Sequence, residues 1–142
     1  MKPDARHCLL WVLIAVVVYI SCFLVNAGGA WYGGPAELYH LVATAVYALF
    51  WVLFTFNARH SGGMARCCLV LAVLTLLAAV TGLLTRSLEL DILMIPALLL
   101  APFSSVPMYG LRFFCGWTGL ELVTILLSSG WLLYSRRIFH KE

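Results

Sequence analysis

The chain has 142 residues, of which 63% are hydrophobic and 11% are charged, and its formal net charge is +3. A soluble domain usually has about 45–50% apolar and about 25% charged residues, so this composition supplies too little polar surface to cover a water-soluble globule. The small positive excess gives no basis for a nucleic-acid-binding surface. An integral membrane protein is therefore the expected class.

Five hydrophobic segments follow one another along the chain, each near the ~20 residues that a transmembrane helix needs. They cover residues 8–25, 38–56, 67–85, 92–111 and 116–135. Because a backbone in lipid must satisfy its own hydrogen bonds, we expect helices rather than strands. The connections are too short to hold a soluble domain. Residues 1–142 are thus predicted to form a single all-α, polytopic bundle of four to five transmembrane helices in the cell membrane.

The first segment resembles a secretory signal in one respect, because the basic residues Lys2 and Arg6 precede it. Its apolar stretch over residues 8–25 is longer than the ~7–15 residues usual in the hydrophobic region of a signal peptide. We therefore interpret it as a retained helix. The connection that follows, NAGGAWYGGPAE, is rich in glycine and predicts a flexible turn.

At the start of the second segment, Glu37 and His40 are three residues apart, so both lie on one face of a helix. Di-iron bundles use Glu-x-x-His, but they need two such motifs and two further glutamates. We interpret the pair as an acid at a helix N-terminus and a histidine whose tip reaches water. The alternative adds Glu89 and Asp91, giving four groups on the outer face that could bind a divalent cation. Our prediction is no metal, no cofactor and no catalytic residue.

Pairs of small residues four positions apart occur in the third and fifth segments. They are Ala78 and Gly82, and Thr124 and Ser128. Such pairs permit close approach of two helices in a membrane. We interpret them as contacts within one bundle rather than as a dimer interface.

The fourth segment, DILMIPALLLAPFSSVPMYGLRFF, has the length of a membrane span but contains Pro96, Pro102 and Pro107. A proline inside a helix removes one hydrogen bond and clashes with the carbonyl four residues earlier, so all three prolines are candidate helix breaks. We expect the helix to break between Pro102 and Pro107, where Ser104 and Ser105 can bond to nearby backbone groups.

Basic residues predict the orientation of the bundle, because cytoplasmic loops are enriched in Lys and Arg. Lys2, Arg6, Arg59 and Arg66 place the N-terminus in the cytoplasm. If the fourth segment crosses fully, five of the nine basic residues lie inside and four outside. If it enters and returns to the outer face, the tail (residues 135–142) also lies inside, and the count becomes seven against two. Charge therefore favours a re-entrant fourth segment, with full crossing as the alternative.

The fifth segment contains an acid, Glu121, and acids inside a membrane span are functional candidates. Glu121 follows Trp117 by four residues, which puts it roughly 6 Å inside the predicted boundary. We expect it to reach water or to pair with Arg112. The alternative is a buried acid with a functional role.

The predicted function is that of a non-catalytic accessory or interaction subunit, which requires the lipid bilayer and either a membrane-protein partner or further copies of this chain. A first alternative is a protomer of a small oligomeric transporter or channel. The broken segment indicates it, because non-helical backbone at membrane depth lines a cavity or is buried by protein. A second alternative is a membrane enzyme that uses the outer-face residues Glu37, His40, Glu89 and Asp91.

Overall fold

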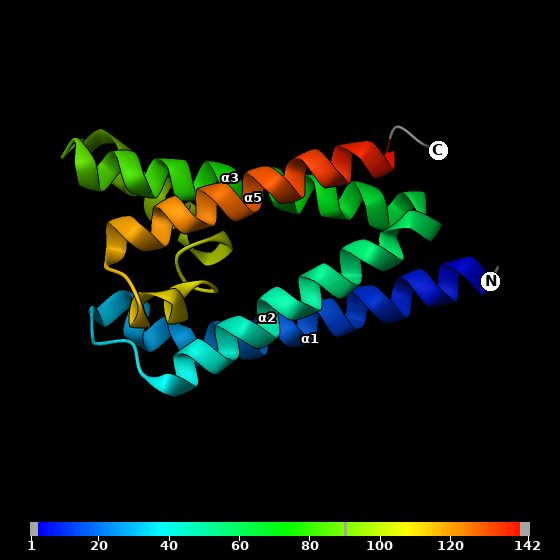
Figure 1. The fold of residues 1–142 in the computed structure, drawn as a ribbon, viewed down its shortest axis with the longest axis horizontal. Coiled ribbons are helices and arrows are strands. Elements are labelled where there is room, and N and C mark those ends of the chain that lie inside the picture. Colours follow the sequence, from blue (N-terminus) through cyan, green and yellow to red (C-terminus); the bar gives the residue numbers. More distant parts are fainter. Residues whose placement is uncertain (1–2, 90, 140–142) are drawn as a thin grey trace.

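A computed structural model describes residues 3–89 and 91–139, and all regular elements within these ranges are helices (Figure 1). The α-helices are α1 (Pro3–Tyr32), α2 (Leu38–Asn57), α3 (Gly62–Ser87), α4 (Met94–Leu100) and α5 (Trp117–Phe139). Four short 3-10 helices join them: η1 (Ala58–His60), η2 (Asp91–Leu93), η3 (Ala101–Phe103) and η4 (Tyr109–Phe113). The predicted all-α class is confirmed for the described residues.

Within the part of the chain that the structure describes, three helices are long and apolar enough to cross a membrane: α1 from Arg6 onward, α2 and α3. α1 and α3 extend beyond the predicted segments 8–25 and 67–85 by several residues at one or both ends. The reason is that an apolar run marks the part of a helix suited to lipid, whereas the backbone hydrogen bonds continue into the polar flanks.

The long helices form two antiparallel pairs, α1 with α2 and α3 with α5 (Figure 1). The start of α1, the α2–α3 connection and the end of α5 all lie at one end of the bundle, on the right in Figure 1. This end carries Arg59, Arg66 and Arg136, and we call it the basic end. The α1–α2 connection, the α3–α4 connection and the start of α5 lie at the opposite end.

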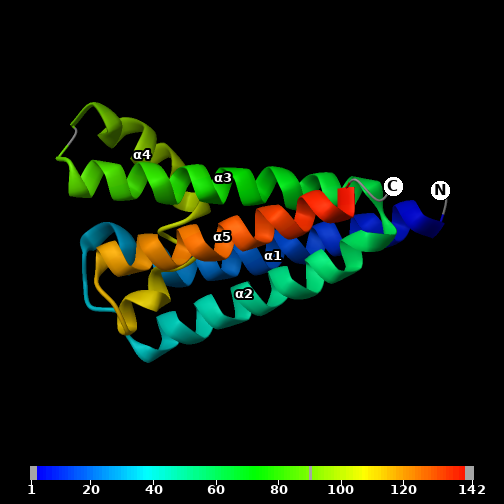
Figure 2. The same ribbon diagram turned by 45° about the horizontal axis from the view of Figure 1, so that its top comes forward.

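Residues 91–115 form what we call the re-entrant segment, since they enter the bundle from the opposite end and return to it (Figures 1 and 2). They do not form one continuous helix: α4 ends at Leu100, a turn follows at residues 104–108, and η4 leads back outward. Pro102 lies in the first turn of η3, and Pro107 lies in the 104–108 turn. Pro96 is not a break, because it occupies the first turn of α4, where a helix needs no amide donor.

The half of the bundle nearer the basic end has an aromatic core. Phe50, Trp51 and Phe54 of α2 are buried there beside Met64 and Cys68 of α3. The Trp51 ring also packs against Trp131 of α5, with ring centroids 5.3 Å apart. The turn adjoins this aromatic core, since Met108 packs against it.

Candidate functional site

The turn of the re-entrant segment is held by polar groups from α1 and α2. The Pro107 carbonyl oxygen accepts hydrogen bonds from Thr44 Oγ1 (2.8 Å), Asn26 Nδ2 (3.2 Å) and Cys22 Sγ (3.5 Å). Thr44 Oγ1 in turn accepts a bond from the Gly110 N–H (3.0 Å). Buried backbone groups must find partners inside the protein, so these side chains allow non-helical backbone to lie at the centre of the bundle.

Two glycines let the segment approach its neighbours at a distance that no side chain would permit. A Cβ at Gly110 would overlap the His40 carbonyl oxygen and lie 2.6 Å from Thr44 Oγ1. A Cβ at Gly29 in α1 would overlap the Tyr109 ring. The path of the segment therefore depends on close contact of Gly110 with the backbone of α2 and of the Tyr109 ring with the backbone of α1.

Glu121 lies on the other side of the turn and is fully buried. Ser105 Oγ donates to its Oε1 at 2.8 Å, and Ser104 Oγ donates to its Oε2 at 3.4 Å. α3 passes close by, since a Cβ at Gly82 would lie 2.8 Å from Glu121 Oε1. The expectation that Glu121 reaches water was wrong, because the re-entrant segment covers it.

The expected pairing of Glu121 with Arg112 was also wrong. The Arg112 guanidinium lies over the Trp117 ring, 4.2 Å from its centroid, and donates to the Gly34 carbonyl oxygen at 2.9 Å. Arg86 lies over the same ring at 4.0 Å. Both arginines therefore stack on an aromatic side chain near the opposite end of the bundle.

Glu37 and His40 are brought together, but as a helix cap. His40 Nδ1 accepts a hydrogen bond from the Glu37 N–H (3.0 Å), and its ring packs against Tyr109 with centroids 5.0 Å apart. His40 is buried, so the expectation that its tip reaches water was wrong; the ring instead folds back over the start of α2.

Glu89 and Asp91 are the other two members of the predicted outer-face group. Among the side chains that the structure describes, which leave out those of residues 3–5, 60, 91 and 138–139, no three of His, Cys, Asp or Glu are placed to hold a metal ion. Glu89 follows the end of α3 with a left-handed φ of 51°. The Asp91 side chain lies outside the part of the chain that the structure describes.

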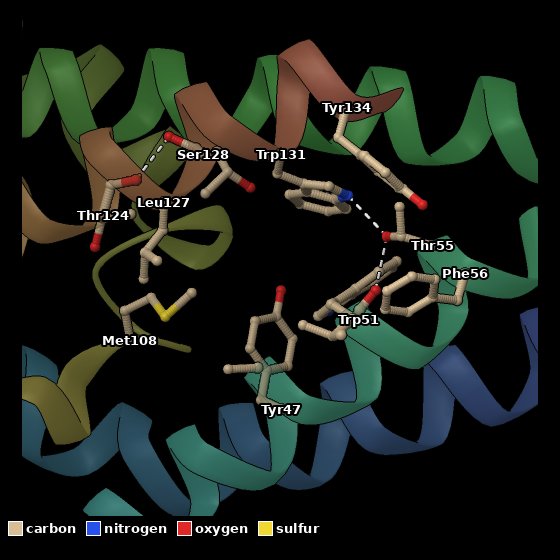
Figure 3. A pocket seen from close by; sticks show the side chains of 13 residues that line it. Tyr47, Trp51, Thr55, Phe56, Met108, Thr124, Leu127, Ser128, Trp131 and Tyr134 are labelled. Atoms are coloured by element: carbon tan, nitrogen blue, oxygen red, sulfur yellow. Dashed lines mark hydrogen bonds between the residues drawn. The ribbon is translucent and has the colours of Figure 1, made fainter. Parts of the chain in front are cut away.

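A cavity of about 340 Å³ lies between α2 and α5 in the half nearer the basic end (Figure 3). Its volume is within the ~300–1,000 Å³ range of small-molecule sites. Its wall combines aromatic rings and hydroxyl groups from the two helices with Met108 of the turn. The main lining residues are Tyr47, Trp51, Thr55, Phe56, Thr124, Leu127, Ser128, Trp131 and Tyr134.

One hydrogen bond bridges the two helices across the cavity, from Trp131 Nε1 to Thr55 Oγ1 at 2.8 Å (Figure 3). Thr124 and Ser128 donate to carbonyls of their own helix. Figure 3 shows the Tyr47 hydroxyl directed into the open space. The interior is thus mainly apolar, with few polar groups, as in sites for hydrophobic ligands.

Sequence reasoning missed this cavity, although part of its wall follows a pattern. Tyr47, Trp51 and Thr55 recur every four residues and so share one face of α2. Thr124 and Ser128 do the same on α5, where we interpreted them only as a packing contact. The sequence therefore indicated a face with aromatic or hydroxyl side chains on each of the two helices. It did not indicate that the two faces lie opposite each other.

A second cavity of about 200 Å³ lies near the opposite end, between α3, α4 and the start of α5. Gly82, Arg86, Ser105 and Trp117 are among its lining residues. Gly82 and Ser105 also contact Glu121. One turn further along α5, Thr124 lines the α2–α5 cavity. Glu121 therefore lies between the two cavities.

Comparison with known proteins finds no match for this chain among protein-family models, curated proteins or solved structures.

Proposed function

We propose that the chain is an integral membrane protein with four spans, α1, α2, α3 and α5, and a fourth hydrophobic segment that enters from the outer side and turns back. The length and apolar character of α1, α2 and α3 support this. α5 has 23 residues, about 35 Å of helix against a hydrocarbon core of about 30 Å. It buries Glu121 and Thr124 inside the bundle while Leu126 and Leu133 are exposed, so its outer face suits lipid.

The distribution of arginines supports an orientation with the basic end in the cytoplasm. Arg59 and Arg66 flank the α2–α3 connection, and Arg136 lies near the end of α5. Arg86 and Arg112 lie near the opposite end. Because cytoplasmic loops are the ones enriched in Lys and Arg, the start of α1 and the end of α5 both face the cytoplasm in this proposal.

Within the membrane, the chain acts as a non-catalytic accessory subunit that binds a hydrocarbon chain of a lipid in the α2–α5 cavity. The observation that carries this proposal is an apolar cavity with exposed apolar side chains in its wall. Val52, Phe56 and Leu127 line it and are each about half exposed on the outside of the bundle. A water molecule needs two to four polar partners, which this wall provides poorly, so a hydrocarbon chain from the surrounding bilayer is the favoured occupant.

Filling the cavity tests the proposal. Ala48 lines it and is half-buried, so the ring introduced by Ala48→Phe takes the space of the lipid chain. We expect the wild-type protein, extracted from cell membranes in mild detergent, to keep one lipid per chain in native mass spectrometry. The A48F variant should lose it.

The matched control is Ala45→Phe, on the same helix but exposed and outside the cavity lining. This variant should keep its lipid. Equal lipid retention in A48F and A45F, a wild-type protein without bound lipid, or a protein recovered outside the membrane fraction would each contradict the proposed function.

Transport of protons is a second candidate, favoured by the position of Glu121 between the two cavities. Its carboxylate is bonded by two serines of non-helical backbone inside the bundle, and such backbone at membrane depth is typical of transporters. On this hypothesis Glu121 takes up a proton from one cavity and releases it to the other.

Glu121→Gln separates the two candidates. Glutamine keeps an acceptor for Ser105, and the Ser104 hydroxyl can rotate to accept from the new amide, so the bundle should assemble with little loss of stability. A transport role predicts that this variant abolishes the decay of a pH gradient across proteoliposomes. A wild-type protein that does not dissipate the gradient, or an E121Q variant with unchanged flux, would remove this candidate.

A further inference from the structure

We propose that the α2–α5 cavity selects a lipid-like amphiphile of the inner leaflet with an anionic head group, which Arg59 binds at the cytoplasmic mouth. This inference rests on the proposed function, because it names the class of molecule whose hydrocarbon chain fills the cavity.

Arg59 is positioned at the mouth by two residues of the cavity wall. It lies in η1, directly after α2. Its Nε donates to the Tyr134 hydroxyl at 2.7 Å, and its Nη2 donates to the same oxygen. The guanidinium carbon also lies 4.9 Å from the centroid of the Phe56 ring and 5.4 Å from that of Tyr134. These contacts tie the guanidinium to the rim of the cavity rather than leaving it free in solution.

The charge of Arg59 remains available to a ligand. Among the residues that the structure describes, its guanidinium contacts aromatic side chains and a hydroxyl rather than a carboxylate. A guanidinium has five N–H donors, of which two are used here, so others can bind two oxygens of a phosphate or carboxylate group. Arginine is the side chain best suited to such bidentate binding.

The cavity has the length of one leaflet. Along α5 it runs from Thr124 to Tyr134, ten residues or about 15 Å of helix, which is half of a hydrocarbon core of about 30 Å. Tyr134, to which Arg59 donates, lines the end of the cavity nearer the basic end, and Met108 of the turn lines the other end (Figure 3). If the head group of the amphiphile binds at Arg59, its hydrocarbon chain therefore lies alongside α5 and ends near the re-entrant turn.

The head-group preference is measured by competition. Delipidated protein in detergent is offered equimolar phosphatidylglycerol and phosphatidylcholine with identical acyl chains, and bound lipid is counted by native mass spectrometry. Wild-type protein should prefer the anionic lipid by about fivefold, the ratio corresponding to ~1 kcal/mol for one basic residue near an anionic head group.

Arg59→Gln should abolish this preference while the protein still binds one lipid, since the apolar wall is unchanged. Arg66→Gln is the matched control, because Arg66 is exposed near the same end but lies outside the cavity lining, and it should keep the preference. Arg59→Lys retains the charge without the bidentate geometry and should retain part of the preference.

The possible outcomes distinguish this inference from the proposed function. The role of Arg59 would be overturned if the R59Q variant still bound phosphatidylglycerol in preference to phosphatidylcholine. It would also be overturned if this variant bound neither lipid. If A48F nevertheless loses its lipid, the proposed function stands. If wild-type protein binds neither lipid, the proposed function itself fails.

Discussion

Replacing Gly110 with alanine is expected to displace the re-entrant segment and to lower the free energy of unfolding by about 3 kcal/mol. The added methyl group would overlap the His40 carbonyl oxygen and lie 2.6 Å from Thr44 Oγ1. The carbonyl belongs to the backbone of α2, so it cannot rotate away as a flexible side chain would. Overpacking alone typically costs ~1–3 kcal/mol, and the displacement also breaks the bond from the Gly110 N–H to Thr44.

The measurement is the thermal unfolding midpoint of the detergent-purified protein, followed by circular dichroism. Gly116→Ala is the control, because a Cβ at Gly116 meets nothing within 4 Å and the residue follows the same segment. G116A should unfold near the wild-type temperature. If G110A and G116A had the same midpoint, close backbone contact would not be what positions the segment.

Thr44→Val is the second substitution with a large expected effect, about 1–3 kcal/mol of destabilisation. Valine has nearly the shape of threonine but removes the hydroxyl that donates to Pro107 and accepts from Gly110. The Gly110 N–H is then buried without its partner, which costs more than the loss of an ordinary interhelical bond in a membrane protein, on average about 0.6 kcal/mol.

Thr81→Val serves as its control, since the Thr81 hydroxyl donates to the carbonyls of Leu77 and Ala78 in its own helix. Chemical denaturation in the same detergent should show a clear loss for T44V and little change for T81V. Similar losses for the two variants would mean that the hydroxyl of Thr44 does not hold the turn.

The helical class and the approximate positions of the long helices could be predicted from the sequence, because length and apolar composition are local properties. The distribution of basic residues indicated the path of the fourth segment. If that segment returns to the end of the bundle from which it enters, Arg136 lies at the same end as Arg59 and Arg66. In the structure, residues 91–115 do return to the end from which they enter. Pro102 and Pro107 also lie where regular α-helix is absent.

The environment of the buried polar residues could not be predicted. The depth of Glu121 was estimated from its distance along α5, but its burial depends on Ser104 and Ser105, which come from another segment and cover it. His40 was expected at water because it lies near a helix end, yet Tyr109 from the re-entrant segment packs over it. Both errors have the same cause, since the cover comes from residues distant in sequence.

The bonds from Asn26 and Thr44 to the Pro107 carbonyl also bear on how the protein is made. Thr44 precedes its partner by 63 residues, and at about 5–20 residues per second a ribosome needs roughly 3–13 s to synthesise that interval. During this time the α1–α2 hairpin presents an amide and a hydroxyl whose final partner does not yet exist. In the proposed membrane topology, the hairpin enters the bilayer before these two polar groups have their partner, so the insertion machinery or a neighbouring chain would shield them until the turn is made.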